Sequence, residues 1–213
     1  MRLYTYFRSS AAFRTRIALN LKGLTYESVP VDLLRGGQHS DSFGERNPAH
    51  LIPVLEDEGL RLTQSLAIIE YVEERYPQPP LLPSAAAARA EVRSLSLSIA
   101  CDIHPLNNQR VLRYLKSPLG ADEEVRNEWA RHWISLGFGA LEQRLAHGGY
   151  SGRCCYGDSP GLADCCLIPQ TANAHRVHCS LDPFPTIRRI YEHCMGLEPF
   201  KKAAPAAQSD AES

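Results

Sequence analysis

The chain lacks a net charge of either sign, long apolar runs and paired cysteine motifs. Its 213 residues carry 23 Lys and Arg against 24 Asp and Glu, a formal net charge of −1. Without a global field, a protein has no general attraction for nucleic acid or an anionic membrane, so we expect neither as a partner. The apolar stretches are far shorter than the ~20 residues of a membrane span, and no export signal is visible. We therefore expect a cytoplasmic protein.

The seven cysteines are odd in number and form no C-x-x-C pair, so we expect reduced thiols. The neighbouring pairs Cys154/Cys155 and Cys165/Cys166 resemble a vicinal redox device. However, adjacent side chains diverge in a helix or strand, and burial in an apolar core is the commoner use of cysteine. The segment 175–179 offers two histidines and a cysteine, but nothing completes a tetrahedral site, so we expect no metal.

What is present is an ordinary globular composition, with 44% hydrophobic and 22% charged residues. The first third mixes strand and helix patterns: a strand at 3–7, a helix at 10–22 and an alternating strand at 25–31 form a βαβ unit. A hairpin at 54–63 and a helix at 64–76 follow, each bounded by turn residues. The predicted order is therefore βαβ and then ββα.

The proline-rich segment 77–84 suits neither a helix nor a central strand and is the predicted linker. Beyond it the strand signal nearly disappears, and four helical patterns are predicted, at residues 85–116, 122–146, 162–176 and 186–195. The polar tail from Lys201 onwards is expected to fray. The second part of the chain is thus predicted to be an all-α domain.

The junction between the first strand and the first helix carries the sequence Arg8-Ser9-Ser10. A helix start presents free backbone N–H groups and a partial positive charge, so an anion can bind there. Either Ser9 or Ser10 is the expected helix cap. From these residues we predict a site that holds and ionises a negatively charged group.

Five motifs, in this order along the chain, resemble the glutathione transferase family and in particular its zeta class. They are FRSSAAFRTRIALNLKG at 7–23, NPAHLIPVL at 47–55, QSLAIIEYVEE at 64–74, CDIHPLNNQRVLRYL at 101–115 and LADCCLIPQ at 162–170. The resemblance implies an α/β thioredoxin-like N-terminal domain at 1–80 that binds glutathione. It also implies an all-helical C-terminal domain at 86–213 that supplies the substrate pocket. A homodimer is the assembly that the resemblance implies.

The resemblance also implies which residues contact glutathione. Ser9, Ser10 and Ala11 would surround the thiol, and Gln64 and Ser65 would hold the γ-glutamyl end. The remaining implied contacts are Gln38 with His39 as a further candidate, Ile52 beside a cis-Pro53, and Asp102, Ile103, His104, Asn108, Gln109 and Arg110 of the helical domain. Gln64-Ser65 opens a helix, where a hydroxyl and free N–H groups meet a carboxylate, although an ordinary cap has the same sequence.

The implied reaction is a glutathione-dependent cis-trans isomerisation of a maleyl-keto dicarboxylate, either maleylpyruvate or maleylacetoacetate, in aromatic catabolism. Ser9 is the chosen hydroxyl donor to the thiolate, with Ser10 assisting it or capping the helix. A small dianionic substrate needs fixed positive groups, and Arg8, Arg110 and Arg176 are the candidates. Arg14 and Arg16 are interpreted as charges on the helix surface, where most arginines lie.

Two positions depart from the zeta pattern. Ala11 stands where that class usually has cysteine, so only its backbone N–H remains for the ligand. Gly161 stands where a Ser or Thr cap is usual, which costs a helix only a few tenths of a kcal/mol. Two other functions are compatible with these motifs. One is a general glutathione transferase or a glutathione-dependent dehalogenase. The other is a non-catalytic glutathione-binding protein, an alternative that remains because Ala11 replaces the usual cysteine.

Overall fold

The computed structural model describes residues 1–212. The chain divides into two compact units. The first contains Met1–Leu81 together with the C-terminal segment from Met195, and the second contains Leu82–Cys194. The C-terminal segment therefore packs with the N-terminal unit, whereas the sequence placed it in a helical domain at 86–213.

The first unit is built on a four-stranded sheet with the strand order β2-β1-β3-β4. Strand β1 (Arg2–Thr5) pairs in parallel with β2 (Glu27–Pro30), and helix α1 (Ser10–Leu21) connects the two. β1 also pairs antiparallel with β3 (Val54–Asp57), which forms a hairpin with β4 (Leu60–Thr63). The predicted βαβ and ββα units, and the thioredoxin-like fold that they build, are confirmed.

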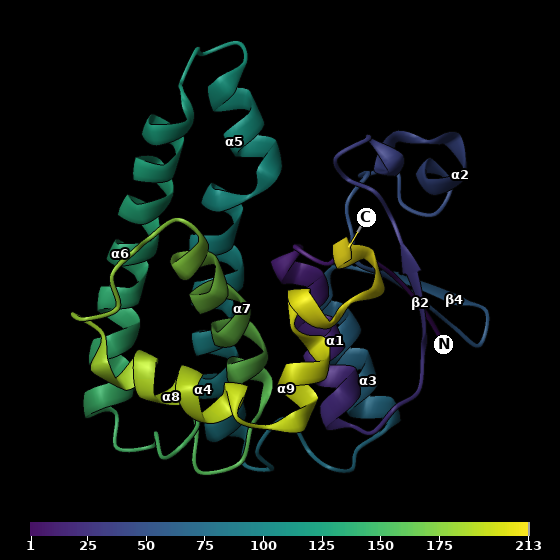
Figure 1. The fold of residues 1–213 in the computed structure, drawn as a ribbon. Coiled ribbons are helices and arrows are strands. Elements are labelled where there is room, and N and C mark those ends of the chain that lie inside the picture. The colour runs from purple at the N-terminus through teal and green to yellow at the C-terminus, as the bar shows by residue number, and fades with distance from the viewer. Residues whose placement is uncertain (213) are drawn as a thin grey trace. The chain divides into compact units, whose positions relative to one another are not determined.

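The two faces of this sheet have different covers because successive side chains of a strand point to opposite sides. On one face, Leu3 and Leu55 pack with Leu19 of α1 and Ile68 of α3 (Ser65–Arg75). On the other face, Tyr4 and Val54 pack with Val31 and with Phe43 of the short helix α2 (Asp41–Gly44). Figure 1 shows α1 and α3 side by side on their face of the sheet.

Helix α1 is buried on nearly every side, because α3 and the sheet cover one part of its surface and α9 (Glu198–Ala203) covers another. Asn20 of α1 donates a hydrogen bond from Nδ2 to the carbonyl oxygen of Pro199, at 2.9 Å. Arg14 and Arg16 are therefore 2% and 0% exposed. The interpretation of these two arginines as surface charges was wrong.

The C-terminal segment is ordered as far as the structure describes it. Two 3₁₀ turns, Pro205–Ala207 and Ser209–Glu212, follow α9. The side chain of Gln208 donates to the carbonyl oxygens of Lys202 and Ala204, which holds the turns to the helix. The expectation that this tail frays was wrong over these residues, and Ser213 lies outside the described chain.

The second unit is helical, as predicted, but its first predicted helix is interrupted. The sequence predicted one helix over 85–116, whereas α4 ends at Leu97 and gives way to a π-helix, a 3₁₀ turn and a new helix. Pro105 has no N–H for an α-helical hydrogen bond, and the Asn108 side chain caps the new helix. The elements are α4 (Ala86–Leu97), the π-helix Ser98–Ile103, the 3₁₀ turn His104–Asn107, α5 (Gln109–Lys116), α6 (Glu123–His147), α7 (Leu162–Arg176) and α8 (Pro185–Met195).

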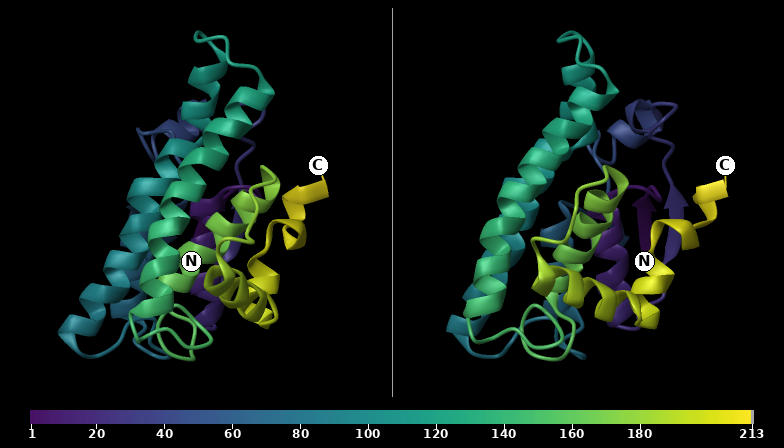
Figure 2. Two further views of the ribbon diagram at one scale, coloured as in Figure 1. Left: turned by 90° about the vertical axis from the view of Figure 1, so that its left-hand side faces the viewer. Right: turned by 60° about the vertical axis from the view of Figure 1, so that its left-hand side comes forward.

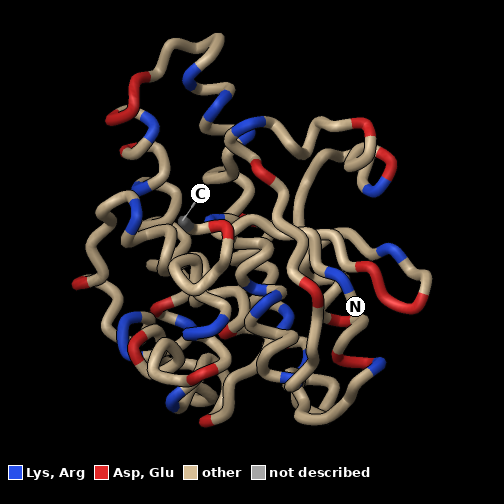
Figure 3. Tube along the Cα trace, turned by 45° about the vertical axis from the view of Figure 1, so that its right-hand side comes forward, with Lys and Arg blue, Asp and Glu red and all other residues tan. Residues whose placement is uncertain are grey.

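Within this unit, α5 and the irregular segment 98–107 lie along α6 (Figure 2). Trp129 of α6 donates from its indole Nε1 to the carbonyl oxygen of Leu106 at 2.8 Å, which fixes the interrupted segment to the long helix. Lys and Arg are interspersed with Asp and Glu along both units (Figure 3). Among residues 1–212, no helix combines the length and apolarity that a membrane crossing requires.

Candidate functional site

The serine junction lies where β1 leads into α1. Ser9 is the N-cap of α1, and its Oγ accepts a hydrogen bond from the N–H of Ala12 at 3.2 Å. Ser10 is the first residue of the helix and is buried. A hydroxyl carries one donor besides its acceptor lone pairs, so Ser9 can cap the helix and still donate its O–H to an anion. The helix dipole adds positive potential at the same place.

Arg8 is exposed directly beside this junction. Its guanidinium carbon lies 5.0 Å from the centroid of the Phe7 ring, which is a cation–π contact. This contact leaves the charged group accessible to a soluble ligand.

Arg14 connects the junction to the start of α3. Its Nη1 donates to Ser65 Oγ at 3.1 Å, and Ser65 is the first residue of α3. The Nε and Nη2 atoms of Arg14 are buried and have no hydrogen-bond partner within residues 1–212. A buried guanidinium with two free donors is costly unless an anion pairs with it. Gln64, with a φ of 68°, places the preceding peptide in an unusual orientation.

Sequence reasoning missed Arg14, although a signal for it was present. Arg14 stands four residues after Ser10, so the two side chains lie on the same face of the helix one turn apart. The charge of arginine favoured a surface position, and only the packing of α3 against α1 reverses that expectation.

Gln38 lies in a 3₁₀ turn, Gly37–His39, on the way to α2. Its side chain is buried, and its Oε1 has no hydrogen-bond partner among the described residues. His50 donates from Nδ1 to the carbonyl oxygen of Gln38 at 2.8 Å, and the His39 and His50 rings are 5.2 Å apart. His39 itself is exposed. The amide oxygen of Gln38 is therefore a buried acceptor that can take a hydrogen bond from a ligand.

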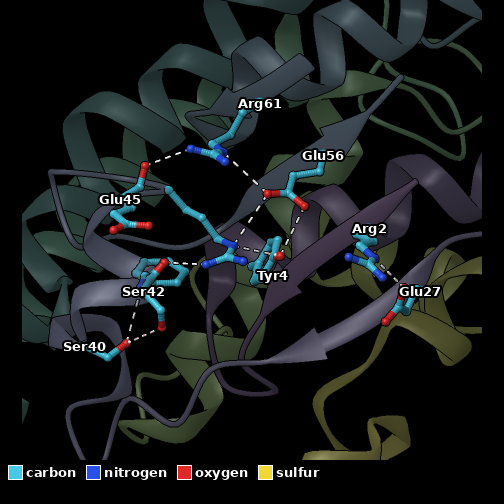
Figure 4. Close-up of polar contacts among 10 residues, drawn as sticks. Arg2, Tyr4, Glu27, Ser40, Ser42, Glu45, Glu56 and Arg61 are labelled. Carbon is cyan, nitrogen blue, oxygen red and sulfur yellow. Dashed lines mark hydrogen bonds and ion pairs between the residues drawn. The ribbon is translucent and has the colours of Figure 1, made fainter. Parts of the chain in front are cut away.

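A network of polar side chains holds the α2 region to the sheet (Figure 4). Arg46 donates to Tyr4 Oη at 2.8 Å and to the carbonyl oxygen of Ser42, and Tyr4 Oη donates to Glu56 at 3.2 Å. Arg61 lies 3.4 Å from the same carboxylate of Glu56. These contacts fix the short segment that carries Gln38 relative to β1 and β3.

Ile52 and Pro53 precede β3, and the peptide bond between them is cis, as predicted. Asn47 is buried and supports this loop, because its Nδ2 donates to the carbonyl oxygen of Leu51 at 2.6 Å. Its Oδ1 accepts from the N–H of Ala49 at 3.0 Å. The loop that holds the backbone of Ile52 is therefore fixed by one buried amide side chain.

The candidates in the helical unit lie on the interrupted segment and at the end of α7. Asp102, Gln109 and Arg110 are exposed, His104 is half-buried and Ile103 is buried. The Asn108 side chain accepts from the N–H of Arg110 at 3.0 Å and therefore caps α5. Arg176 is the exposed last residue of α7.

Cys154, Asp164 and Cys194 place ligand-type atoms within 4.8 Å of one another in the core of the helical unit. The Asp164 oxygens accept from the backbone N–H of Cys155 at 2.8 Å and of Gly161 at 2.9 Å, so this carboxylate caps α7. Burial raises the pKa of Asp164, and a hydrogen bond with Cys154 together with burial raises the pKa of the Cys194 thiol. Metal ligation requires deprotonated thiols, which this environment opposes.

Comparison with known proteins places this arrangement in a family. Residues 1–74 match the family model described as glutathione S-transferase, N-terminal domain. A probable maleylacetoacetate isomerase of Vibrio cholerae is 50% identical over 211 residues, which cover 98% of this chain and 97% of the relative. The holo structure of a maleylpyruvate isomerase, a bacterial zeta-class glutathione transferase, has a TM-score of 0.97 and 47% identity and covers 99% of this chain and 100% of its own.

A maleylacetoacetate isomerase of Methylobacterium extorquens AM1, solved with bound malonate and glutathione, has a TM-score of 0.96 and 41% identity. The match covers 100% of this chain and 100% of that chain.

Proposed function

Because the chain belongs to the zeta class of glutathione transferases, we propose that it is a glutathione-dependent isomerase that converts a maleyl-keto dicarboxylate from cis to trans. The observation that carries the proposal is the serine junction, where the hydroxyl of Ser9 caps α1 and retains its proton for an anion. Maleylpyruvate and maleylacetoacetate are the two candidate substrates.

Buried polar groups of the first unit fit glutathione. The peptide-like ligand has a γ-glutamyl carboxylate that can pair with the free donors of Arg14, beside Ser65 and Gln64 at the start of α3. Gln38 offers its free Oε1 to the other end of the ligand, and the backbone of Ile52, before Pro53, offers hydrogen bonds of the kind that join strands. Arg14 and Gln38, whose buried polar atoms have no partner in the described chain, would thus gain one when glutathione binds.

Glutathione supplies a thiolate that adds to the maleyl double bond and leaves again after the resulting single bond has rotated. Ser9 donates its hydroxyl proton toward the sulfur, and Ser10 and the backbone N–H of Ala11 add positive potential at the helix start. These groups favour the thiolate, whose ordinary pKa is about 8.5. Ala11 contributes through its backbone alone, because it has no thiol or hydroxyl group.

The substrate is a dianion, and charge grows on its carbonyl oxygen when the double bond is attacked. Arg8, Arg110 and Arg176 are exposed guanidinium groups that hold the carboxylates and this growing charge. Asp102, Ile103, His104, Asn108 and Gln109 complete the set that we assign to ligand binding. The side-chain oxygen of Asn108 already accepts a hydrogen bond from the N–H of Arg110, so its amide NH₂ group is the part that we assign to the ligand.

A second copy of the chain is the partner that we propose. The helical unit exposes several large apolar side chains, namely Leu97, Tyr114, Leu119, Val125 and Leu136. We assign these side chains, which lie on or beside α4, α5 and α6, to the interface between the two copies, where they would be removed from water. Sedimentation at micromolar concentration should give a dimer, and a monomer there would refute this assignment.

The test measures turnover of maleylpyruvate and of maleylacetoacetate, each with and without glutathione. We expect conversion to the fumaryl product only with glutathione. No turnover of either compound would overturn the proposal. Arg8→Ala and Arg176→Ala should each reduce turnover, with Arg153→Ala as a control at another exposed arginine. If both variants keep full activity, the dianion is not the substrate, and a general transferase or dehalogenase reaction gains support.

A further inference from the structure

The turn that presents Ser9 is held at its backbone by two charged side chains from outside the turn. Ser9 donates its N–H to the carbonyl oxygen of Tyr6 at 3.0 Å, so residues 6–9 form a turn between β1 and α1. The place of the Ser9 hydroxyl therefore depends on the peptide groups of Tyr6 and Phe7. Any group that fixes these two peptides also fixes the hydroxyl.

Arg16 holds the carbonyl side of this turn. Its Nη1 donates to the carbonyl oxygen of Tyr6 at 3.3 Å and to Thr5 Oγ1 at 2.8 Å. Its Nη2 donates to the carbonyl oxygen of Phe7 at 3.1 Å, and its Nε donates to that of Ala203 at 2.9 Å. A guanidinium is planar and rigid, so these bonds fix the turn relative to the end of α9.

Asp210 holds the amide side of the same turn. Its Oδ2 accepts from the backbone N–H of Phe7 at 2.9 Å. The peptide groups of Phe7 are therefore bound on both sides, at the N–H by Asp210 and at the C=O by Arg16. Both bonds involve a charged group, and hydrogen bonds of this kind are about twice as strong as neutral ones.

We propose that Arg16 and Asp210 are positioning residues that fix the Ser9 hydroxyl for thiol activation, so that the C-terminal segment forms part of the catalytic support. Neither residue touches the thiol in this role. The inference rests on the proposed function, because it assigns the purpose of the turn to the glutathione thiolate.

The sign of one pKa change separates positioning from a direct effect of charge. A carboxylate near a thiol disfavours the thiolate, so removal of the Asp210 charge alone should lower the thiol pKa or leave it unchanged. Loss of the bond to Phe7 should do the opposite, because the Ser9 hydroxyl moves away from the sulfur. Asp210→Ala removes both the charge and the bond, whereas Asp210→Asn keeps an oxygen that accepts from the Phe7 N–H.

The experiment titrates the thiolate absorbance of the glutathione complex in the full-length chain. For Asp210→Ala we expect a rise of about half a unit to one unit in the thiol pKa, which lowers the ratio of thiolate to thiol at a given pH about three- to tenfold. The exposed control Glu198→Ala should have the thiol pKa of the wild type. For Asp210→Asn the thiol pKa should equal that of the wild type or lie below it. At saturating glutathione, the kcat of Asp210→Ala should be lower than that of the wild type.

Hydrogen exchange of the free protein gives a second readout. The amides of Phe7 and Ser9 should exchange faster in Asp210→Ala and in Arg16→Lys than in Glu198→Ala. An unchanged or lowered thiol pKa in Asp210→Ala overturns the positioning role, as does unchanged exchange in both variants. If the wild type lowers the thiol pKa and Asp210→Ala raises it, but neither maleyl compound turns over, then the positioning role stands and the isomerase proposal falls.

Discussion

Arg14→Met should leave the free protein folded but weaken glutathione binding. In the free protein Arg14 is 2% exposed and makes one hydrogen bond, to Ser65, while its Nε and Nη2 have no partner in the described chain. Methionine removes the buried charge. It also removes the hydrogen bond to Ser65, and that loss lowers the stability of the free protein by about 1 kcal/mol. These two effects oppose each other, because a buried charge without a partner is itself destabilising. We therefore expect the stability of the free protein to change by about 1 kcal/mol or less.

The effect on binding is larger, because a hydrogen bond to a charged group contributes about 1.5–3 kcal/mol. Loss of one such bond to the γ-glutamyl carboxylate weakens binding about 10- to 150-fold. At a glutathione concentration of about 100 times Kd, the wild type gains about 2.7 kcal/mol of stability from the ligand. A variant with a Kd about 30-fold higher gains only about 0.9 kcal/mol at the same concentration.

Urea unfolding of both proteins, with and without glutathione, measures these four stabilities. Arg75→Met is the matched control, since Arg75 lies on α3 with a side chain that is 50% exposed and pairs with Glu58. Arg75→Met should change neither the stability of the free protein nor its stabilisation by glutathione by more than about 0.5 kcal/mol. If Arg14→Met keeps the full stabilisation by glutathione, then the γ-glutamyl carboxylate does not pair with Arg14.

Two further predictions concern stability. Lys22→Met should destabilise the first unit by about 3–5 kcal/mol, because it leaves the buried Glu73 carboxylate without its ammonium partner, the two side chains being 0% and 8% exposed. The double variant Lys22→Met/Glu73→Leu should recover most of that loss in urea unfolding, and a double variant no better than the single one would contradict the mechanism. In the helical unit, the hydrogen bond from Arg144 lowers the pKa of Glu91 below its usual 4.5. The stability that this bond contributes is present above pH 4.5 and is lost as the pH falls through the lowered pKa. Glu91→Gln should remove this part of the acid destabilisation, and an unchanged pH profile would contradict it.

The order of elements in the first unit could be predicted because each one has a local cause. Ser9 caps α1, Gly23 with a φ of 67° follows its end, and Gly59 with a φ of 84° completes the β3–β4 turn. These are interactions between residues a few positions apart, so the sequence pattern contains them. The motif order also identified the family, and with it the residues at the two helix starts.

The interrupted helix shows where local patterns mislead. The apolar spacing over 85–116 is helical throughout, and Pro105 indicated only a distortion. The actual break begins at Ser98, several residues before the proline, and the segment is held by Trp129 of α6, which contacts Leu106. A bond to a residue 23 positions away is not visible in the pattern of the segment itself.

The sequence by itself determined which residues could form the serine junction, since the cap, the helix and the strand are all local. Tertiary structure alone decided that Arg14 and Arg16 are buried. A helical period of 3.6 residues defines the faces of α1 but not what covers each face. Arg16 is bonded to Ala203, 187 residues further along the chain, and Phe7 to Asp210, 203 residues further. Burial of a charge depends on such distant partners, so only the folded chain shows that the C-terminal segment holds the turn before Ser9.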